Sequence, residues 1–386
     1  DTNNHAIRVA DLESHEVTNP GHHRALGPMT AFLDALRAGP LLTDGAMGSY
    51  LFERTGRLSE RNHVYECLSL DSPEVVREVH RAYLDAGARC VTTNTFGANR
   101  SHLAPLGERE RGQEINRTGV SLARGAIEDF DLERSRGPYF VFGSVGPTLS
   151  GGESKMEAAD VYREQISVLV EEGVDGLLLE TFASLSHVDA VIDIVRSFDK
   201  APPFIIQMSL EKSGTEAGWS KAALDLIAMG ADSGADVVGV NCLTPWDASA
   251  FLEAVDRVPS VANGDVLLSV MPNGGGFQRI GHRYMTHVNP EYMGKLARTF
   301  AERGVRLIGG CCEVHPGHIR EMANYLHALD AADRPSTVAS ATRPRSVDND
   351  VKRDNGPFSR KIKDKEFTVS VEILPPRGTA RKTVVA

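Results

Sequence analysis

The segment Val305-Arg-Leu-Ile-Gly-Gly-Cys-Cys312 decides the fold, because a short apolar run ends there in two glycines and two adjacent cysteines. The run predicts a buried strand, and the glycines predict a tight turn where that strand ends. A third cysteine ends the similar run Val237-Val-Gly-Val-Asn-Cys242. Two strands that end in thiols predict three sulfur atoms at one rim of a barrel. Three thiolates suit zinc and leave a fourth position open for a substrate, which is the layout of a catalytic metal site.

Two other interpretations of these cysteines stay open on the sequence alone. Adjacent cysteines can form a strained vicinal disulfide, or they can pack as two small buried residues. The spacing also matches no finger-type zinc motif, which pairs Cys-x-x-Cys or His-x-x-x-His elements. The position of all three thiols at strand ends favours the metal site, provided that the barrel forms.

Six more apolar runs resemble these two and bring the number of predicted strands to eight. Helical patterns separate the runs, and each run is apolar throughout, as is typical of parallel strands covered by helices. The helical patterns end in glycine just before a strand, and proline stands near the start of two of them. We therefore expect an α/β fold of the (β/α)8 TIM-barrel class rather than a doubly wound open sheet. The predicted strands are 41–44, 90–96, 139–144, 176–181, 204–208, 237–242, 266–270 and 306–310.

The ends of the chain differ in character from the barrel, which we expect over residues 29–330. Residues 1–28 are polar and aperiodic and are predicted to form an N-terminal arm. Residues 331–366 are rich in Asp, Arg, Lys, Ser and Pro, which predicts a solvated linker. Residues 367–386 begin like a strand and stop in a turn, so we expect them to open a second, truncated domain.

Composition limits the classes of function. The chain has 386 residues, of which 41% are hydrophobic and 24% charged, with a net charge of -10. The mild acidity argues against a nucleic-acid partner, and no apolar run reaches the roughly 20 residues that cross a membrane. Five cysteines form no framework of a small disulfide-rich domain. With no signal peptide at the start, we expect a reducing, cytoplasmic setting.

Active groups of such barrels come from the carboxyl ends of the strands. Asp44 follows the first predicted strand and Glu180 ends the fourth, so two carboxylates should face the same mouth as the three thiols. Glu180 follows three leucines, and a charge that ends a buried strand needs a partner. Asp44 precedes a glycine, which is also typical of an ordinary turn. Cys67 and Cys90 match no ligand position and are expected to be packing residues.

Several of these strand ends, taken in order, resemble the homocysteine S-methyltransferase family. That family includes the homocysteine module of cobalamin-dependent methionine synthase and betaine–homocysteine methyltransferase. The resemblance covers roughly residues 30–330. The segments that carry it are Asp44-Gly-Ala-Met-Gly48, Thr93-Asn-Thr-Phe-Gly-Ala-Asn-Arg100, Glu180-Thr-Phe182, Gly239-Val-Asn-Cys242, Pro272-Asn-Gly-Gly275 and Gly309-Gly-Cys-Cys312.

The resemblance implies the roles of the thiols. Cys242, Cys311 and Cys312 would hold Zn²⁺, and the thiol of L-homocysteine would enter as the fourth ligand. A zinc-bound thiol is deprotonated at neutral pH, so the thiolate would attack the methyl group and give L-methionine without a separate protein base. Asn273 is implied as a zinc ligand when substrate is absent.

The resemblance also implies a substrate pocket. Asp44 and Glu180 would bind the amino group of homocysteine, and backbone amides near Gly45 and Ala46 would meet its carboxylate. Asn241 is placed with them, although an asparagine there can also satisfy loop backbone. The methyl donor stays open between methyl-folate through a corrinoid partner, betaine, S-methylmethionine and S-adenosylmethionine.

The chain departs from the family after the last cysteine. The family usually continues Gly-Thr-Thr-Pro, whereas this chain has Glu313-Val-His-Pro316, which puts an acid and an imidazole beside the predicted metal. Met271 also stands where relatives often carry a carboxylate. We expect His315 and His318 to lie in the first turn of the last helix.

The tail has its own resemblance. Ser370-Val-Glu-Ile-Leu-Pro-Pro-Arg-Gly378 resembles the opening strand of methylenetetrahydrofolate reductase, a flavin-dependent barrel in which the glutamate, here Glu372, is a general acid. FAD would belong only to the part of that domain that this chain lacks. The resemblance implies a bifunctional polypeptide in which a methyltransferase precedes a reductase.

Two other functions compete with methyl transfer. One is a zinc- or thiol-binding module without catalysis that docks a fused reductase. The other is a different zinc barrel enzyme, such as an aldolase or a hydrolase, although those generally use histidine and carboxylate ligands.

Overall fold

The structure is a computed structural model. It describes residues 31–55, 64–134, 138–149, 155–210, 216–275, 277–280, 283–286 and 288–332, together with Lys361 and Asp364. The predicted arm, almost all of the predicted linker and residues 367–386 with Glu372 lie outside these described ranges. The chain divides into two units after Asp333, and the account below concerns the first unit.

Eight parallel strands form one sheet in the order β1-β10-β7-β6-β5-β4-β3-β2. The two outer strands also meet, because Thr43 and Cys90 form a parallel bridge and the Arg89 N–H donates to the Leu42 carbonyl at 2.8 Å. The predicted (β/α)8 barrel is therefore confirmed. The strands are β1 Leu41–Leu42, β2 Cys90–Thr92, β3 Phe140–Val145, β4 Gly176–Phe182, β5 Phe204–Met208, β6 Val237–Asn241, β7 Leu267–Met271 and β10 Val305–Ile308.

The predicted strand boundaries need some corrections. β2 stops at Thr92 rather than at 96, because Thr95 donates its backbone N–H to the Thr93 carbonyl in a local turn. β10 stops at Ile308, before the two glycines. A two-stranded antiparallel sheet that the sequence did not predict follows β7. It consists of β8 (Phe277–Ile280) and β9 (Arg283–Thr286).

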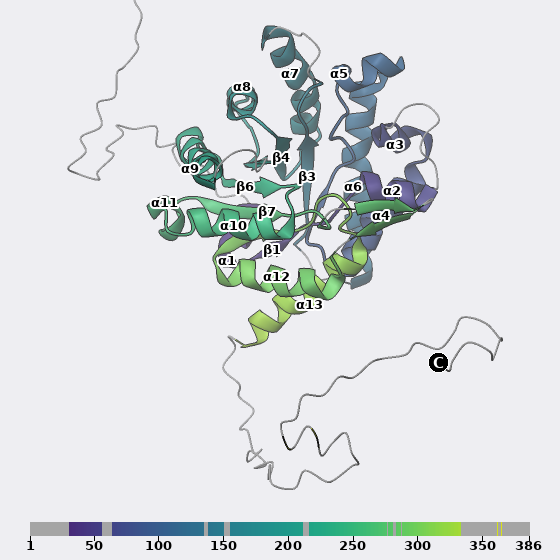
Figure 1. Ribbon diagram of the computed structural model, residues 1–386. Helices are drawn as coiled ribbons and strands as arrows, with labels where there is room; N and C mark the ends of the chain where they lie inside the picture. The colour runs from purple at the N-terminus through teal and green to yellow at the C-terminus, as the bar shows by residue number, and fades with distance from the viewer. Residues whose placement is uncertain are drawn as a thin grey trace, which may run out of the picture. The chain divides into compact units, whose positions relative to one another are not determined.

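Helices surround the strands, as Figure 1 shows for α4, α6, α7, α8, α9, α10, α12 and α13. The α-helices are α1 Ala31–Ala38, α2 Gly48–Thr55, α3 Leu68–Asp71, α4 Pro73–Ala86, α5 Arg100–Leu103, α6 Gly112–Arg134, α7 Lys155–Glu171, α8 Leu185–Arg196, α9 Glu216–Ser233, α10 Pro245–Val255, α11 Pro259–Ala262, α12 Pro290–Glu302 and α13 Pro316–Ala332. Short 3-10 turns cover Tyr65–Cys67, Ala104–Leu106 and Arg109–Arg111.

Helix ends follow the sequence signals closely. The glycines that were expected between a helix and the next strand include Gly87, Gly173, Gly234 and Gly304, and all four have positive φ. Glycine adopts this left-handed conformation without steric cost, so the chain turns sharply from each helix into the next strand. His318 lies in the first turn of α13 as expected, whereas His315 precedes that helix.

The barrel interior is filled and closed at one end by α1. Phe32 of α1 packs edge-on against Phe140 and Phe142 of β3, with ring centroids 5.5 and 5.0 Å apart. The same interior cluster contains Cys90, which is therefore a packing residue as predicted. Phe140 is the first residue of its strand, so α1 covers the end where strands begin. The carboxyl ends of the strands are left for the site.

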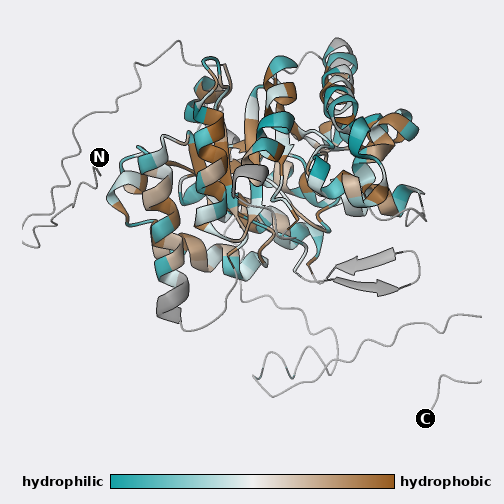
Figure 2. Ribbon diagram, turned by 90° about the horizontal axis from the view of Figure 1, so that it is seen from above, coloured by the Kyte–Doolittle hydropathy of each residue, from teal (hydrophilic) through white to brown (hydrophobic). Residues whose placement is uncertain are grey.

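A second and larger core lies between the strands and the surrounding helices. The helices carry both hydrophobic and hydrophilic stretches, as Figure 2 shows, which fits helices that have one buried face. Within the described part of the chain, we find no helix whose length and apolar character would let it cross a membrane.

Close strand packing makes Gly239 irreplaceable. A Cβ atom there would lie 1.8 Å from the Ser269 carbonyl oxygen on the neighbouring strand β7. We expect Gly239→Ala to destabilise the protein by at least about 3 kcal/mol in urea unfolding, because backbone would have to move. Gly39→Ala is the control, since nothing lies within 4 Å of its Cβ position. Equal stability of the two variants would contradict this packing.

Candidate active site

Three thiols meet at the open end of the barrel. Cys242 follows β6, and Cys311 and Cys312 follow β10. The Cys242 and Cys312 Sγ atoms are 3.5 Å apart, those of Cys311 and Cys312 are 4.0 Å apart, and all three sulfurs lie within 4.8 Å of one another. All three are free thiols, so the vicinal disulfide is not formed.

The spacing of the sulfurs fits a zinc ion. Zn–S bonds of about 2.3 Å in tetrahedral geometry put two sulfur ligands roughly 3.8 Å apart. The observed separations of 3.5 and 4.0 Å lie on either side of that value. Three soft ligands also leave one tetrahedral position for a fourth. The donor set therefore fits the predicted metal.

Backbone bonds to the end of β7 hold both cysteine segments. The Cys242 N–H donates to the Met271 carbonyl at 3.1 Å, and the Cys311 N–H donates to the Pro272 carbonyl at 2.9 Å. The Cys312 carbonyl accepts from the Gly274 N–H at 2.9 Å. The thiols are thus fixed by main-chain contacts that do not require a metal.

The thiols cannot all ionise together without a cation. Hydrogen bonds from Cys311 and Cys312 lower the pKa of Cys242 to about 4. The hydrogen bond with Cys242 raises the pKa of Cys312 to about 12, and the pKa of Cys311 is raised as well. The Cys242 thiolate thus accepts hydrogen bonds from the thiols of Cys311 and Cys312. A divalent cation would offset the charge of three.

Asp44 is a buried carboxylate on the same rim. Its side chain is 3% exposed and accepts hydrogen bonds from the Thr92 N–H at 2.7 Å and the Thr92 hydroxyl at 2.9 Å. Burial raises the pKa of Asp44 to about 7 against these two bonds, and the charge of Glu180 raises it further. The bonds to Thr92 hold the side chain in place. They exclude the interpretation of Asp44 as an ordinary solvent-exposed turn residue.

Glu180 is a second, half-buried carboxylate. It accepts a short hydrogen bond from the Ser144 hydroxyl at the end of β3, and Asn241 donates to it at 3.3 Å. Burial raises its pKa to about 7, and nearby Cys312 and Glu66 add to that rise. Both predicted carboxylates therefore face a cation-poor environment that an ammonium group would relieve.

Asn241 connects Glu180 to the thiols. Its amide nitrogen is 3.3 Å from the Glu180 carboxylate, 2.7 Å from the Thr181 hydroxyl and 3.8 Å from Cys311 Sγ. Its amide oxygen accepts the Thr181 N–H at 2.9 Å. The side chain is thus engaged on both sides, and it holds Glu180 and Cys311 at a set separation.

Backbone strain marks the same rim. Thr181, Cys242 and Glu313 have φ values of 63°, 57° and 63°, in a region that residues other than glycine rarely adopt. Such conformations cost free energy and cluster at functional sites. Here they occur directly after Glu180, at the first thiol and directly after the last thiol.

The amides predicted to meet a substrate carboxylate are partly engaged. The Ala46 N–H donates to the Val314 carbonyl at 3.0 Å, so in this conformation it is not available for a ligand. A Cβ atom at Gly45 would lie 2.0 Å from the same carbonyl oxygen, so glycine is required there for close packing. Asn273, the predicted open-state zinc ligand, donates to the Cys242 carbonyl at 3.0 Å and accepts from the Gly275 N–H at 2.9 Å.

Sequence reasoning missed several residues that shape the site. Glu66 is 9% exposed, accepts the Gly97 N–H at 2.6 Å and raises the pKa of Glu180. Thr92 and Ser144 fix the two carboxylates. Polar residues within or at the ends of apolar runs were a usable signal for Thr92 and Ser144, but no motif marks Glu66.

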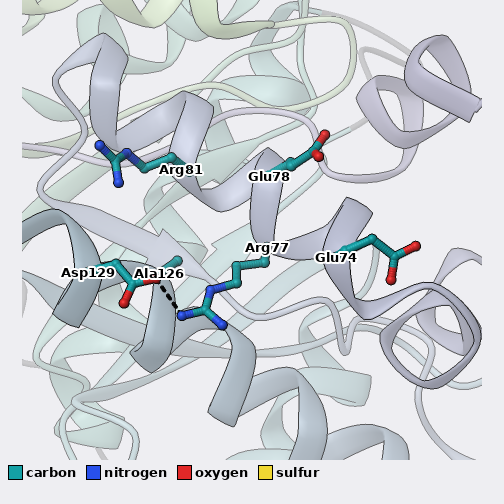
Figure 3. A pocket seen from close by; sticks show the side chains of 6 residues that line it. All are labelled: Glu74, Arg77, Glu78, Arg81, Ala126 and Asp129. Atoms are coloured by element: carbon teal, nitrogen blue, oxygen red, sulfur yellow. Dashed lines mark hydrogen bonds and ion pairs between the residues drawn. The ribbon is translucent and has the colours of Figure 1, made fainter.

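A hollow that is separate from the thiol cluster lies on the outside of the barrel, between α4 and α6. Figure 3 shows its lining, with Arg77 turned towards Asp129. Arg77 pairs with Asp129, and Arg81 pairs with Asp85 at 3.2 Å. This hollow is lined by no thiol and lies on helices rather than at strand ends. We therefore interpret its charged residues as ordinary ion pairs of a solvent-exposed surface.

Comparisons with known proteins identify the family of the chain. The family model described as homocysteine S-methyltransferase matches residues 41–326. A methionine synthase from Mycobacterium tuberculosis is 32% identical over 310 residues, which are 76% of this chain and 25% of that protein. The chain thus spans about a quarter of the length of this curated relative.

Solved structures give the same result for the fold. The homocysteine methyltransferase MmuM from Escherichia coli in its oxidised form matches with a TM-score of 0.64 and 26% identity, over 76% of this chain and 98% of that one. Its metallated form matches with a TM-score of 0.62 and 25% identity, over 75% of this chain and 99% of that one.

The raised pKa of Glu180 predicts how stability depends on pH. The folded state releases this proton near pH 7 and the unfolded chain near 4.5, so ionisation costs the folded state free energy as the pH rises between these values. We expect Glu180→Gln to stabilise the metal-free protein by on the order of 2 kcal/mol at pH 8, and by little at pH 4.

Urea unfolding at both pH values measures this difference. Glu128→Gln, at an exposed position away from the ends of α6, is the matched control and should show no difference between the two pH values. A Glu180→Gln effect that does not depend on pH would show that the carboxylate is not held protonated by burial.

Proposed function

This chain belongs to the homocysteine S-methyltransferase family, and from that membership we propose that it transfers a methyl group to the thiol of L-homocysteine and gives L-methionine. In this proposal Cys242, Cys311 and Cys312 hold Zn²⁺, and the substrate thiol takes the fourth position. Asp44 and Glu180 bind the substrate ammonium group. The metallated form of the related MmuM supports a metal in this fold.

The observation that carries the proposal is the bridge that Asn241 makes between a carboxylate and a thiol. Its amide nitrogen is 3.3 Å from Glu180 and 3.8 Å from Cys311 Sγ. In homocysteine the sulfur and the amino nitrogen are four bonds apart. A carboxylate for the ammonium and a thiol cluster for the sulfur, separated by one amide group, suit an amino acid with its thiol on the γ carbon.

The charges of the site also suit this substrate. Burial raises the pKa of both Asp44 and Glu180 to about 7, so each binds a proton more readily than an exposed carboxyl. An ammonium group supplies the missing positive charge and favours the ionised form of both carboxylates. A thiol without an amino group would leave both carboxylates without their partner.

Bound zinc would supply a Lewis acid that keeps the substrate sulfur as a thiolate, which is the nucleophilic form. The protein's own part is to orient the substrate through Asp44 and Glu180 and to leave the sulfur accessible. Cys312 is exposed, so the donor reaches the thiol cluster from solvent. Positioning of the two reactants is then the main contribution of the chain to the rate.

Four donors are candidates in this proposal: methyl-folate through a corrinoid partner, betaine, S-methylmethionine and S-adenosylmethionine. Because Cys312 opens to solvent, the thiol cluster accepts a donor from outside. We also propose a cytoplasmic setting, since five free thiols require reducing conditions.

The domain plan is part of the proposal as well. α13 ends at Ala332, close to the predicted start of the linker at 331. We propose that residues 1–28 form an arm, that 29–330 form the barrel and 331–366 the linker, and that 367–386 begin a reductase-like domain with Glu372. The bifunctional arrangement rests on the Ser370–Gly378 segment alone.

We expect purified protein to retain about one zinc per chain and to form methionine from homocysteine with at least one of the four donors. Cys311→Ser and Cys312→Ser should lose both zinc and activity, because too few thiolates remain. Cys67→Ser, outside the cluster, is the control. Full zinc retention in a variant that carries both Cys311→Ser and Cys312→Ser would contradict the ligand assignment. Homocysteine binding without methionine from any donor would favour the docking module.

We expect Glu180→Gln to weaken homocysteine binding by about 1.5–3 kcal/mol, the range for hydrogen bonds to charged groups, and to leave zinc in place. A thiol without an amino group should bind wild type and variant alike, because it makes no use of Glu180. Calorimetry with both ligands and metal analysis measure these effects. Parallel loss of both ligands would make Glu180 a structural residue.

A further inference from the structure

Two segments of the rim are joined by more contacts than barrel pairing requires. One follows β1 and runs from Asp44 into α2, and the other follows β10 and carries the last two thiols. Tyr83 on α4 clamps them, since its hydroxyl is 2.7 Å from the Ala46 carbonyl and 3.1 Å from the Val314 carbonyl. The Gly310 N–H also donates to the Asp44 carbonyl at 3.1 Å.

His315 adds a side-chain link between the same segments. Its Nδ1 is 2.9 Å from a Glu53 carboxylate oxygen, and its Nε2 is 3.2 Å from Ser49 Oγ. Both partners lie on α2, which follows Asp44 in the chain. The His315 ring also packs against Tyr50, with ring centroids 5.2 Å apart. We call His315, Ser49 and Glu53 the His315 latch.

The contacts of the His315 latch indicate a structural link between two segments and not a catalytic pair. Burial lowers the pKa of His315, which favours the neutral imidazole, against the charge of Glu53. With its Nδ1 proton donated to Glu53, Nε2 accepts the Ser49 hydroxyl proton. The Ser49 oxygen also accepts the Glu313 N–H at 3.3 Å. A serine bonded from both sides links two segments of the chain and is not an accessible nucleophile.

We propose that His315 is a positioning residue that sets the distance between the metal-binding thiols and the ammonium-binding Asp44. Homocysteine must reach both at once, so a shift of one segment weakens the two-point contact and leaves each single contact intact. This inference rests on the proposed function, because it uses Asp44 as the partner of the substrate ammonium. It explains why an imidazole suits a position so close to the thiols.

The test compares binding of homocysteine and of a thiol without an amino group to zinc-loaded protein by calorimetry. We expect His315→Ala to raise the Kd of homocysteine about tenfold, within the range seen for indirect coupling, and to leave the Kd of the simple thiol and the zinc content unchanged. Ser49→Ala should act in the same direction. His327→Ala, an exposed histidine on the same helix, should change nothing.

A double-variant cycle separates positioning from general loosening. If His315 acts through Asp44, its substitution should have little further effect on homocysteine binding in an Asp44→Asn background. Thermal unfolding checks that the variants are folded. If His315→Ala itself does not fold, the Ser49→Ala cycle with Asp44→Asn decides the question at the other end of the same bond.

Other outcomes overturn the latch. Equal weakening of both ligands, loss of zinc, or full additivity with Asp44→Asn would make His315 a stability residue only. Unchanged homocysteine binding in His315→Ala and Ser49→Ala, with normal binding by wild type, would overturn the latch and leave the proposed function intact. Wild-type protein that binds zinc but no homocysteine would overturn the proposed function and the latch with it.

Discussion

The site depends on one feature of the barrel, the position of β10 between β1 and β7. Leu41 pairs with Leu307 on one side, and Ile308 pairs with Val270 on the other. The chain that leaves β10 therefore passes between the segment with Asp44 and the end of β7, to which the Cys242 N–H is also bonded. Its amides bond to both, at Asp44 and at Pro272. Parallel pairing thus brings thiols and a carboxylate together before any ligand binds.

That arrangement gathers groups of one sign. Three thiols, Asp44 and Glu180 lie at the same rim, and burial raises the pKa of both carboxyls. Buried like charges are costly, so the rest of the barrel holds these groups together at the expense of stability. A divalent metal and an ammonium group are the two cations that would relieve it.

The sequence predicted what depends on local pattern. Apolar runs and closing glycines such as Gly87 gave the barrel, and the family resemblance gave the ligand set. It could not show that the Ala46 amide is engaged, because its partner Val314 comes from the far end of the barrel sequence. Glu66 was missed for the same reason, since only folding brings it to Gly97. The local sequence pattern could not predict such contacts between segments that are distant in the chain.

The departure from the family after Cys312 lies beyond the main-chain bonds that hold the thiols. The ligands are fixed by main-chain bonds to the end of β7, as at Pro272, and these bonds do not involve the side chains that follow. Glu313 and His315 are instead engaged with Ser49 on α2, the helix that follows Asp44 in the chain. A change of sequence there leaves the metal ligands in place and alters how the substrate side is held.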